Sequence, residues 1–303
     1  MEYLPDINNT IKLLCKKYAR GTLIKARIGM RTNGDLHLGN LFPIIASVLI
    51  GEKLIARGYK YRLIVVLVDQ EINGNKPSFN KTTYLNNATL AQYSIEKIKK
   101  FMSKLVLKKV TFDVQFKTVS KTQRTKKFRK LLKIILDNAN EKPPIFTTCP
   151  KCEKLLKKYT KTRHILTYYC SCCQEKFNLD IRDPRSFILT DHDLLGAIEN
   201  NILHMNIHIL GADHTLKSKG ISSLQKRERF QDIIDRNNSY LTLLTPLIYF
   251  KGKKMSKSNS NGIFLDEIKK YYKKKYISAL KSFVARHYSK RKITINHISD
   301  ICE

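Results

Sequence analysis

The chain has 303 residues, of which 42% are hydrophobic, enough for one large or two ordinary domains with a substantial core. Its 57 Lys and Arg residues against 25 Asp and Glu residues give a formal charge of +32. This excess favours polyanionic partners, nucleic acid first, over a lysine-rich surface that only solvates the fold. No apolar signal segment begins the chain, and the apolar run Leu41 to Ile50 contains Pro43 and is too short to span a bilayer. We therefore expect a cytoplasmic protein without a membrane partner.

The first 70 residues predict a βαβ unit. An amphipathic helix carries Leu4, Ile7, Ile11, Leu14 and Tyr18 on one face, and Arg20-Gly21 ends it. A strand from Leu23 to Ile28, a glycine-containing turn and a helix from Leu38 to about Arg57 follow. Leu63 to Val68 is an unbroken apolar run, as in parallel strands covered on both faces. The fold class is therefore α/β with a Rossmann-like parallel sheet, and Asp69 stands at the carboxyl end of a strand, where such sheets place ligand contacts.

The middle of the chain predicts a polar, turn-rich stretch and then alternating helices and strands. Residues 70–87 are polar, and apolar residues from Ala91 to Leu105 mark a helix. We expect a strand over Val110 to Val119 and a helix over Thr122 to Asp137.

Two CxxC pairs predict a zinc module. Cys149 and Cys152 form the first pair, and Cys170 and Cys173 form the second after a gap of 17 residues. This spacing fits a closed, tetrahedral, four-thiolate Zn²⁺ site with a structural role. Cys172 is placed outside the site, since Cys170 and Cys173 keep the CxxC spacing.

The remaining elements bring further polar residues to strand ends. Asp191, His192 and Asp193 follow a strand over Ser186 to Thr190; a helix cap is favoured over a metal or acid–base cluster. Gly211-Ala212-Asp213-His214 follows a strand over Asn206 to Leu210. A last strand spans Leu241 to Phe250, and one helical stripe contains Leu265, Ile268, Tyr272, Tyr276, Leu280 and Phe283. Residues 251–303 hold 14 Lys and Arg against 4 Asp and Glu, so this basic helix either contacts an RNA backbone or is a solvated face.

The chain is organised around two polar segments, Ile28 to Leu41 and Lys251 to Ser258. The first places His37 and Asn40 one helical turn apart at the start of a helix, after a turn with Gly34. Strand, glycine-containing turn and helix together favour an anion, usually phosphate, at the helix N-terminus. The second segment holds Lys254 and Lys257 in a short polar loop.

His37 to Asn40 (HLGN) and Lys254 to Ser258 (KMSKS) resemble the two signatures of class I aminoacyl-tRNA synthetases, over roughly Leu23 to Tyr271. The resemblance implies amino-acid activation with ATP and Mg²⁺, followed by transfer to the acceptor end of tRNA. It implies catalytic roles for His37, Asn40, Lys254 and Lys257. It further implies ATP contacts from Gly34, Gly39, Gly211, Asp213, His214, Met255, Ser256 and Ser258, and amino-acid contacts from Arg27, Gly29, Arg31 and Asp69.

The same resemblance predicts how the chain is divided. Residues 1–85 and 186–262 would form the two halves of the nucleotide-binding fold, and 86–185 a connective insertion with the zinc module. Residues 263–303 would form a basic helical segment. Only 45 residues follow Ser258, too few for the anticodon-binding domain of a full synthetase. We therefore expect a catalytic core that reads the acceptor end or charges an unusual acceptor, similar in plan to the truncated glutamyl-queuosine tRNA synthetases. The sequence carries no signal for the oligomeric state.

The order of these parts looks most like the class I lysyl-tRNA synthetases, so lysine is the leading substrate. The chain has no tryptophan for the aromatic wall expected around a lysine stem, and Arg27 lies where glutamyl enzymes carry a carboxylate-binding arginine. Glutamate is therefore the alternative. A non-catalytic tRNA-binding paralogue is a further alternative, opposed by the intact signatures. A nucleotidyltransferase of similar fold is opposed by the charge and the zinc module.

Overall fold

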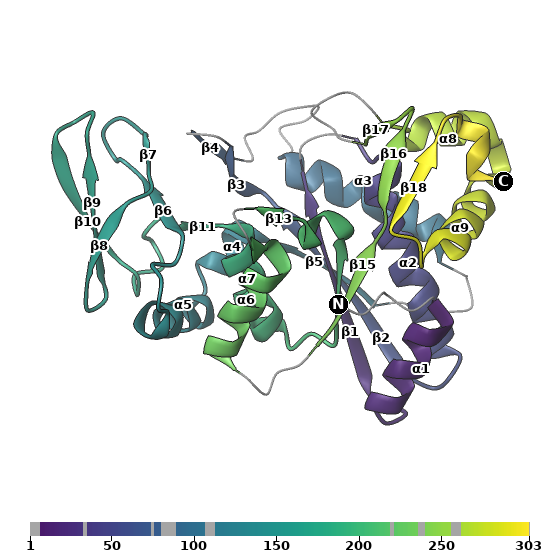
Figure 1. The fold of residues 1–303 in the computed structure, drawn as a ribbon, viewed down its shortest axis with the longest axis horizontal. Helices are drawn as coiled ribbons and strands as arrows, with labels where there is room; N and C mark the ends of the chain where they lie inside the picture. Colours follow the sequence, from purple (N-terminus) through teal and green to yellow (C-terminus); the bar gives the residue numbers. More distant parts are fainter. Residues whose placement is uncertain are drawn as a thin grey trace.

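A five-stranded, all-parallel sheet forms the centre of the molecule in the computed structural model, which describes residues 7–32, 35–73, 76–79, 89–106, 113–218, 221–235, 240–255 and 262–302 (Figure 1). Its strand order is β15-β12-β1-β2-β5. The strands are β1 (Leu23–Arg31), β2 (Lys60–Val68), β5 (Asp113–Thr118), β12 (Ile207–Gly211) and β15 (Leu241–Thr245). In chain order this is the 3-2-1-4-5 arrangement of Rossmann-type folds. The predicted fold class is confirmed.

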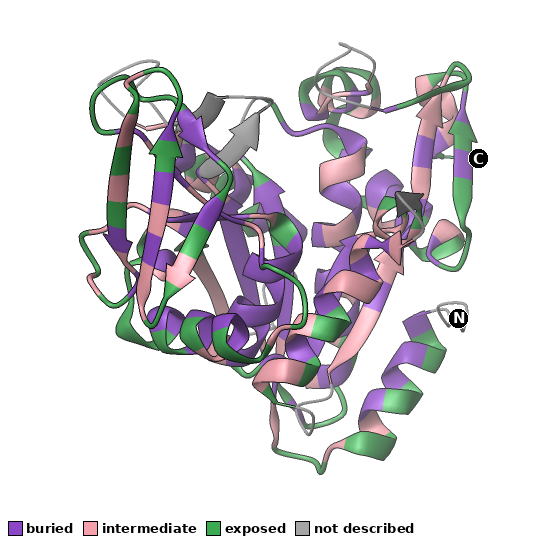
Figure 2. Ribbon diagram, turned by 60° about the vertical axis from the view of Figure 1, so that its left-hand side comes forward, coloured by how far each residue is buried: buried purple, intermediate pink, exposed green. Residues whose placement is uncertain are grey.

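Helices cover both faces of this sheet, as the unbroken apolar run in β2 predicted. Leu63, Val65 and Leu67 pack into one buried cluster, whereas Ile64 and Val66 pack into the other. The first cluster includes residues of α1 (Ile7–Lys17), α2 (Leu38–Ile55), α3 (Leu90–Leu105), α8 (Leu265–Tyr272) and α9 (Tyr276–His287). The second includes residues of α4 (Val119–Gln123), α5 (Lys126–Asn138) and α6 (His192–Leu203), and partly buried residues of α7 (Ser223–Ile234) pack against it. Figure 2 shows the buried residues gathered on the central strands and on the inner faces of these helices.

The segment with the two CxxC pairs forms small antiparallel sheets at one end of the molecule (Figure 1, left). One sheet contains β8 (Tyr159–Thr162), β9 (Ile165–Cys170) and β10 (Glu175–Asp180), and the other contains β6 (Ile145–Thr148), β7 (Leu155–Leu156) and β11 (Leu189–Thr190). Two hairpins lie elsewhere: β3 (Gln70–Asn73) with β4 (Lys76–Phe79), and β13 (Lys217–Ser218) with β14 (Ile221–Ser222). The first hairpin falls in the stretch predicted only as turn-rich. The divisions after residues 85, 185 and 262 stay predictions.

The predicted strand over Leu241 to Phe250 is wrong, because it is two strands in different sheets. Pro246 separates β15 from β16 (Leu247–Phe250), and β16 pairs with β17 (Lys253–Lys254) and β18 (Lys292–Ile295). Proline has no N–H to donate to a strand ladder, so the chain leaves the central sheet there.

The prediction of a single C-terminal helix is also wrong. Lys273 has a φ of 48°, which ends α8 before the 3-10 turns η4 (Lys273–Lys275) and later η5 (Ile298–Ile301), with α9 between them. The 3-10 turn η2 (Ala212–Thr215) follows β12.

Helix α2 has 18 residues and is apolar enough, by length and composition, to cross a membrane. The structure places it in the core, with 61% of this stretch buried. It contacts α1, α9 and β2, so the same composition serves to cover the central sheet.

Helix α9 is fixed on α2 by an aromatic contact that generates a stability prediction. Phe283 and Phe42 are each 1% exposed, and their rings meet edge-on with centroids 6.2 Å apart. Phe283→Ala should lower the free energy of unfolding by about 3–5 kcal/mol, because it leaves a cavity in this packed layer. Leu13→Ala, at a side chain that is 47% exposed, should change it by less than about 0.5 kcal/mol. Urea unfolding of both variants is the measurement, and equal midpoints would contradict the packing described.

Candidate functional site

The candidate site lies at the carboxyl edge of the central sheet, between β1 and β12. The strand order reverses at this point, and the helices that follow the two strands, α2 and α7, pack into opposite clusters. In α/β folds ligands bind outside the strand ends at such a switch point, and we call this region the crevice. Arg31 ends β1 and Gly211 ends β12, so the segments after both strands meet at this crevice.

His37 is the N-cap residue of α2 and is 9% exposed. Its Nδ1 accepts a hydrogen bond from the N–H of Gly39 at 3.0 Å, so the neutral ring carries its proton on Nε2 and is a donor there. A Cβ on residue 39 would lie 2.8 Å from the His37 ring, so glycine is required for this cap. The amide oxygen of Asn40, in the first turn of α2, is buried without a hydrogen-bond partner among the described residues.

The two signature segments are joined by backbone hydrogen bonds. The N–H of Leu38 donates to the carbonyl of Ile263 at 2.9 Å, and the N–H of Leu265 donates to the carbonyl of Leu36 at 2.9 Å. The His37 ring meets the Phe264 ring edge-on, with centroids 6.4 Å apart. The residues that follow the KMSKS segment therefore pair with the start of α2. Of the predicted site residues, Gly34, Ser256, Lys257 and Ser258 lie outside the described residues.

Lys254, on β17, reaches Asp213, which follows β12. Its Nζ lies 2.9 Å from a carboxylate oxygen of Asp213, and both side chains are close to half exposed. Burial alone would raise the pKa of Asp213, but the hydrogen bond from Lys254 and the charge of His214 outweigh burial and lower it. A Cβ on Gly211 would lie 2.4 Å from the Asp213 carboxylate, so this glycine lets the carboxylate fold back over the strand end. Met255 is 7% exposed and packs in the core.

Beneath the crevice lies a buried network of charged side chains. Arg27, on β1, forms an ion pair with Glu199 of α6, and both side chains are almost fully buried. Burial raises the pKa of Glu199, and the charge of Arg27 partly offsets this. His208 is the neighbour of Arg27 in the paired strand, and its Nε2 accepts from Arg27 at 2.5 Å. Burial, together with Arg27 and Arg227, holds the pKa of His208 well below its usual value, so its ring is neutral.

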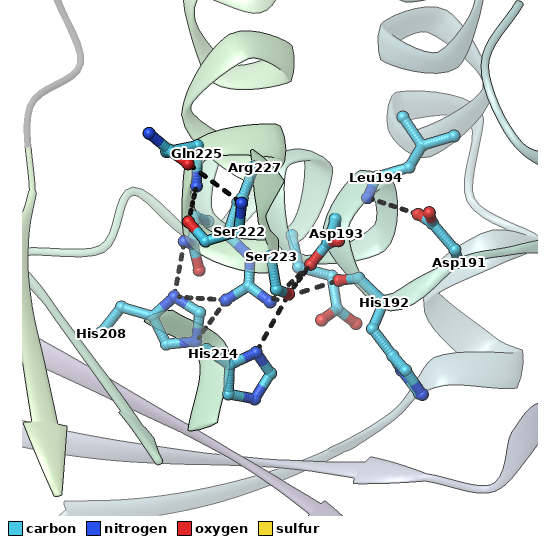
Figure 3. Close-up of polar contacts among 12 residues, drawn as sticks. Asp191, His192, Asp193, Leu194, His208, His214, Ser222, Ser223, Gln225 and Arg227 are labelled. Atoms are coloured by element: carbon cyan, nitrogen blue, oxygen red, sulfur yellow. Dashed lines mark hydrogen bonds and ion pairs between the residues drawn. The ribbon is translucent and has the colours of Figure 1, made fainter. Parts of the chain in front are cut away.

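Arg227, on α7, extends this network toward the crevice (Figure 3). Its guanidinium lies 3.2 Å from Nδ1 of His208 and 3.7 Å from the carboxylate of Asp193. Ser223 donates to the same carboxylate, and its Oγ lies 3.1 Å from Nδ1 of His214. Since the hydroxyl proton goes to Asp193, the Ser223 oxygen accepts from Nδ1–H of His214, which leaves Nε2 of a neutral His214 as an acceptor.

Open space borders this network on β1. Arg27, Gly29 and Arg31 alternate along one face of the strand, and no atom lies within 4 Å of a Cβ built on Gly29. The predicted amino-acid contacts on β1 are therefore one buried and paired arginine, one open position and one exposed arginine. Asp69, at the end of β2, is 8% exposed and accepts a hydrogen bond from the N–H of Ser120 at 2.9 Å.

The favoured interpretation of Asp191 as a helix cap is confirmed. Its carboxylate accepts from the N–H of Leu194 at 2.9 Å at the start of α6. Asp193, by contrast, points into the network with Arg227 and Ser223 (Figure 3).

The structure brings together the four predicted cysteines and leaves Cys172 exposed outside the group. The Sγ atoms of Cys149 and Cys173 are 3.8 Å apart, and those of Cys152 and Cys170 are 3.6 Å apart. Four sulfurs placed tetrahedrally at about 2.3 Å from one Zn²⁺ would be about 3.8 Å apart. The donor set and its spacing therefore fit a structural zinc ion.

Glu199, His208, Ser223 and Arg227 were not predicted as site residues. A signal was present for His208, which is the one polar side chain in the apolar strand β12. A buried polar side chain requires a partner, but the sequence does not show which residues meet.

His192, at the start of α6, generates a pH prediction. Desolvation by its surroundings and the charge of Arg31 lower the pKa of His192 to about 4, although the residue is exposed, so the folded chain excludes a proton that the unfolded chain binds below about pH 6.5. This contribution to stability is present above pH 6.5 and is lost as the pH falls; because solvent screens an exposed ring, the loss at pH 5 is at most about 1 kcal/mol.

Burial raises the pKa of Asp191 to about 6, which gives a pH dependence of opposite sign, so a matched variant is needed. Relative to wild type, His192→Gln should gain at most about 1 kcal/mol in unfolding free energy between pH 7.5 and pH 5, measured with urea. Identical pH dependence in both proteins would contradict a lowered pKa of His192.

The cysteine cluster generates a metal prediction. Purified protein should contain about one zinc per chain, by mass spectrometry of the metal content. Cys173→Ser should lose the zinc and lower the thermal midpoint, because the closed site stabilises the fold. Cys172→Ser is the control and should retain both the zinc and the thermal midpoint of the wild type. A metal-free preparation with an unchanged midpoint would count against the site.

Comparison with known proteins gives likeness only in three dimensions. No protein-family model matches the sequence, and no curated protein sequence matches it. A Campylobacter jejuni protein described as an arginyl-tRNA synthetase is similar with a TM-score of 0.45 and 12% identity, over 98% of this chain and 71% of that one. A tyrosyl-tRNA synthetase of Archaeoglobus fulgidus is similar with a TM-score of 0.41 and 16% identity, over 88% of this chain and 69% of that one. The tyrosyl-tRNA synthetase of Leishmania major is similar with a TM-score of 0.45 and 14% identity, over 90% of this chain and 34% of that one. At this identity none of them assigns a substrate to this chain.

Proposed function

We propose that this chain is the catalytic core of a class I-type aminoacyl-tRNA ligase, which activates an amino acid with ATP and transfers it to the acceptor end of tRNA. The leading substrate is lysine. The observation that carries the proposal is the contact of Lys254 with Asp213 at the switch point. This contact brings the KMSKS segment to the end of β12. The neighbouring strand β1 leads to the HLGN segment, which begins α2.

The proposed reaction asks little covalent chemistry of the protein. A carboxylate oxygen of the amino acid attacks the α-phosphorus of ATP, and the bond from that phosphorus to the bridging oxygen breaks as pyrophosphate leaves. A terminal hydroxyl of tRNA then attacks the carbonyl carbon, and AMP leaves. Positioning and stabilisation of phosphate charge are the tasks left to side chains.

His37 and the start of α2 suit the phosphate-binding task. The cap leaves His37 with an N–H donor at Nε2, and the helix N-terminus favours negative charge. Asn40 lies in the same turn, and its side-chain NH2 group would be the donor to a phosphate oxygen. We assign both residues to the phosphates of ATP.

Lys254 suits the pyrophosphate-stabilising task, together with Lys257. Asp213 holds Lys254 at the site, and the more strongly charged pyrophosphate would draw the ammonium away from that carboxylate as the bond breaks. Mg²⁺ bound with ATP would neutralise part of the same charge. We assign Asp213 and His214 to contacts with the adenylate, where the acceptor nitrogen of His214 suits a hydroxyl donor.

The charges on β1 support lysine over glutamate. Glu199 neutralises Arg27, so this arginine neither repels an ammonium group nor stands ready to bind a carboxylate. The open position at Gly29 would admit a side chain, and Asp69 supplies negative charge close enough to affect the pKa of Glu199. Glutamate remains the alternative substrate, with exposed Arg31 as its partner.

Pyrophosphate exchange into ATP with each of the twenty amino acids, with and without bulk tRNA, tests the proposal. Exchange with lysine alone is expected. Exchange with glutamate alone would overturn the substrate, and no exchange under any condition, with tRNA still bound, would favour a non-catalytic RNA-binding paralogue.

Lys254→Ala tests the assigned lysine. The variant should slow exchange by about 100-fold, because a charge that stabilises the leaving group is lost. Binding of tRNA should change much less. Lys253→Ala is the matched control, since Lys253 has the same charge on the same short strand, and strand neighbours point to opposite faces. Equal effects of the two variants would remove Lys254 from the mechanism.

A further inference from the structure

A second pocket lies between α3 and α8, next to the segment that precedes α2. Its cavity volume is about 490 Å³, within the range of sites for small ligands. Asp35 and Leu36 form one wall, and Tyr276, at the start of α9, forms part of the floor. None of the residues assigned to amino-acid activation lines it.

The floor of the pocket is aromatic and contains an unpaired hydroxyl. Phe101 is 2% exposed and Tyr276 is 7% exposed, and Phe264 is half-buried beside them. The Tyr276 hydroxyl is buried and has no hydrogen-bond partner among the described residues. The Phe264 ring is the least buried of the three, so it is the aromatic surface that a ligand in the pocket would meet.

The rim of the pocket is positively charged. Four lysines line it, namely Lys97, Lys100, Lys104 and Lys269. Its two aspartates are already paired, Asp35 with Lys97 and Asp266 with Lys269, the latter at 2.7 Å. Lys100 and Lys104 lie one turn apart on α3, both exposed, and neither forms an ion pair in the described part of the chain. The surplus charge of the rim is therefore carried by these two lysines.

We propose that this pocket binds a nucleoside phosphate unit. The ring of the base would pack on Phe264, and the phosphate would lie between Lys100 and Lys104. Aromatic faces beside lysines are the combination that binds single nucleotides or single strands without reading their sequence. An acidic peptide would use the lysines and leave the aromatic floor without a partner.

The experiment measures binding of uridine 5′-monophosphate by calorimetry and of fluorescent pentauridylate by anisotropy. Neither probe is the ATP of the proposed reaction. Lys100→Ala/Lys104→Ala should weaken binding by at least about tenfold, since hydrogen bonds to charged groups are lost. Lys270→Ala/Lys274→Ala removes two exposed lysines outside the pocket and should weaken it less than about twofold. Phe264→Leu should weaken binding about tenfold, because it removes the ring on which the base would stack.

The outcomes distinguish the source of the ligand and can overturn the proposal. If Lys100→Ala/Lys104→Ala weakens the binding of both probes, a mononucleotide is sufficient as the ligand. If it weakens the binding of pentauridylate alone, the ligand is a nucleotide within an RNA strand. Both results support the pocket. Equal affinities of the two lysine-pair variants would overturn it. So would displacement of both probes by polyglutamate at equal charge, which would identify an acidic-peptide site. Failure of pyrophosphate exchange has no bearing on these results, so the two proposals are tested separately.

Discussion

The buried ion pair between Arg27 and Glu199 is the interaction on which the rest of the site depends. It joins β1 to α6, and His208 and Arg227 extend it to β12 and α7. In an interior of low polarity each charge is stable only beside its partner, and loss of one partner from such a pair typically costs about 3–5 kcal/mol. The pair therefore fixes the elements that form the floor of the crevice, and it decides which charges a substrate meets there.

A second constraint unites parts of the chain that are more than 200 residues apart. The backbone of residues 36–38 pairs with that of residues 263–265, while Lys254 reaches Asp213 from the small sheet of β16, β17 and β18. The start of α2 follows a strand of the central sheet, whereas Lys254 lies on a strand of the small sheet. Their relative position is set by a few backbone hydrogen bonds and one partly exposed ion pair.

Patterns that act over a few residues could be predicted from the sequence. The βαβ unit, the two covered faces of β2, the cysteine group and the Asp191 cap all depend on neighbours in sequence or on fixed spacing. The partner of Arg27 could not, because Glu199 comes from a helix 172 positions away and many carboxylates compete for that role in a sequence. The end of α8 at Lys273 has no glycine to mark it. Pro246 was a signal for the break between β15 and β16, but the apolar residues on both sides of it favoured a single strand.

The break at Pro246 changes what controls Lys254. Strand β17, which carries this lysine, pairs with β16, and the other neighbour of β16 is β18, close to the C-terminus. The small sheet of β16, β17 and β18 therefore places this lysine, and the central sheet does not. Because β18 lies close to the C-terminus, the geometry of the ion pair between Lys254 and Asp213 depends on how the last residues of the described chain pair with β16.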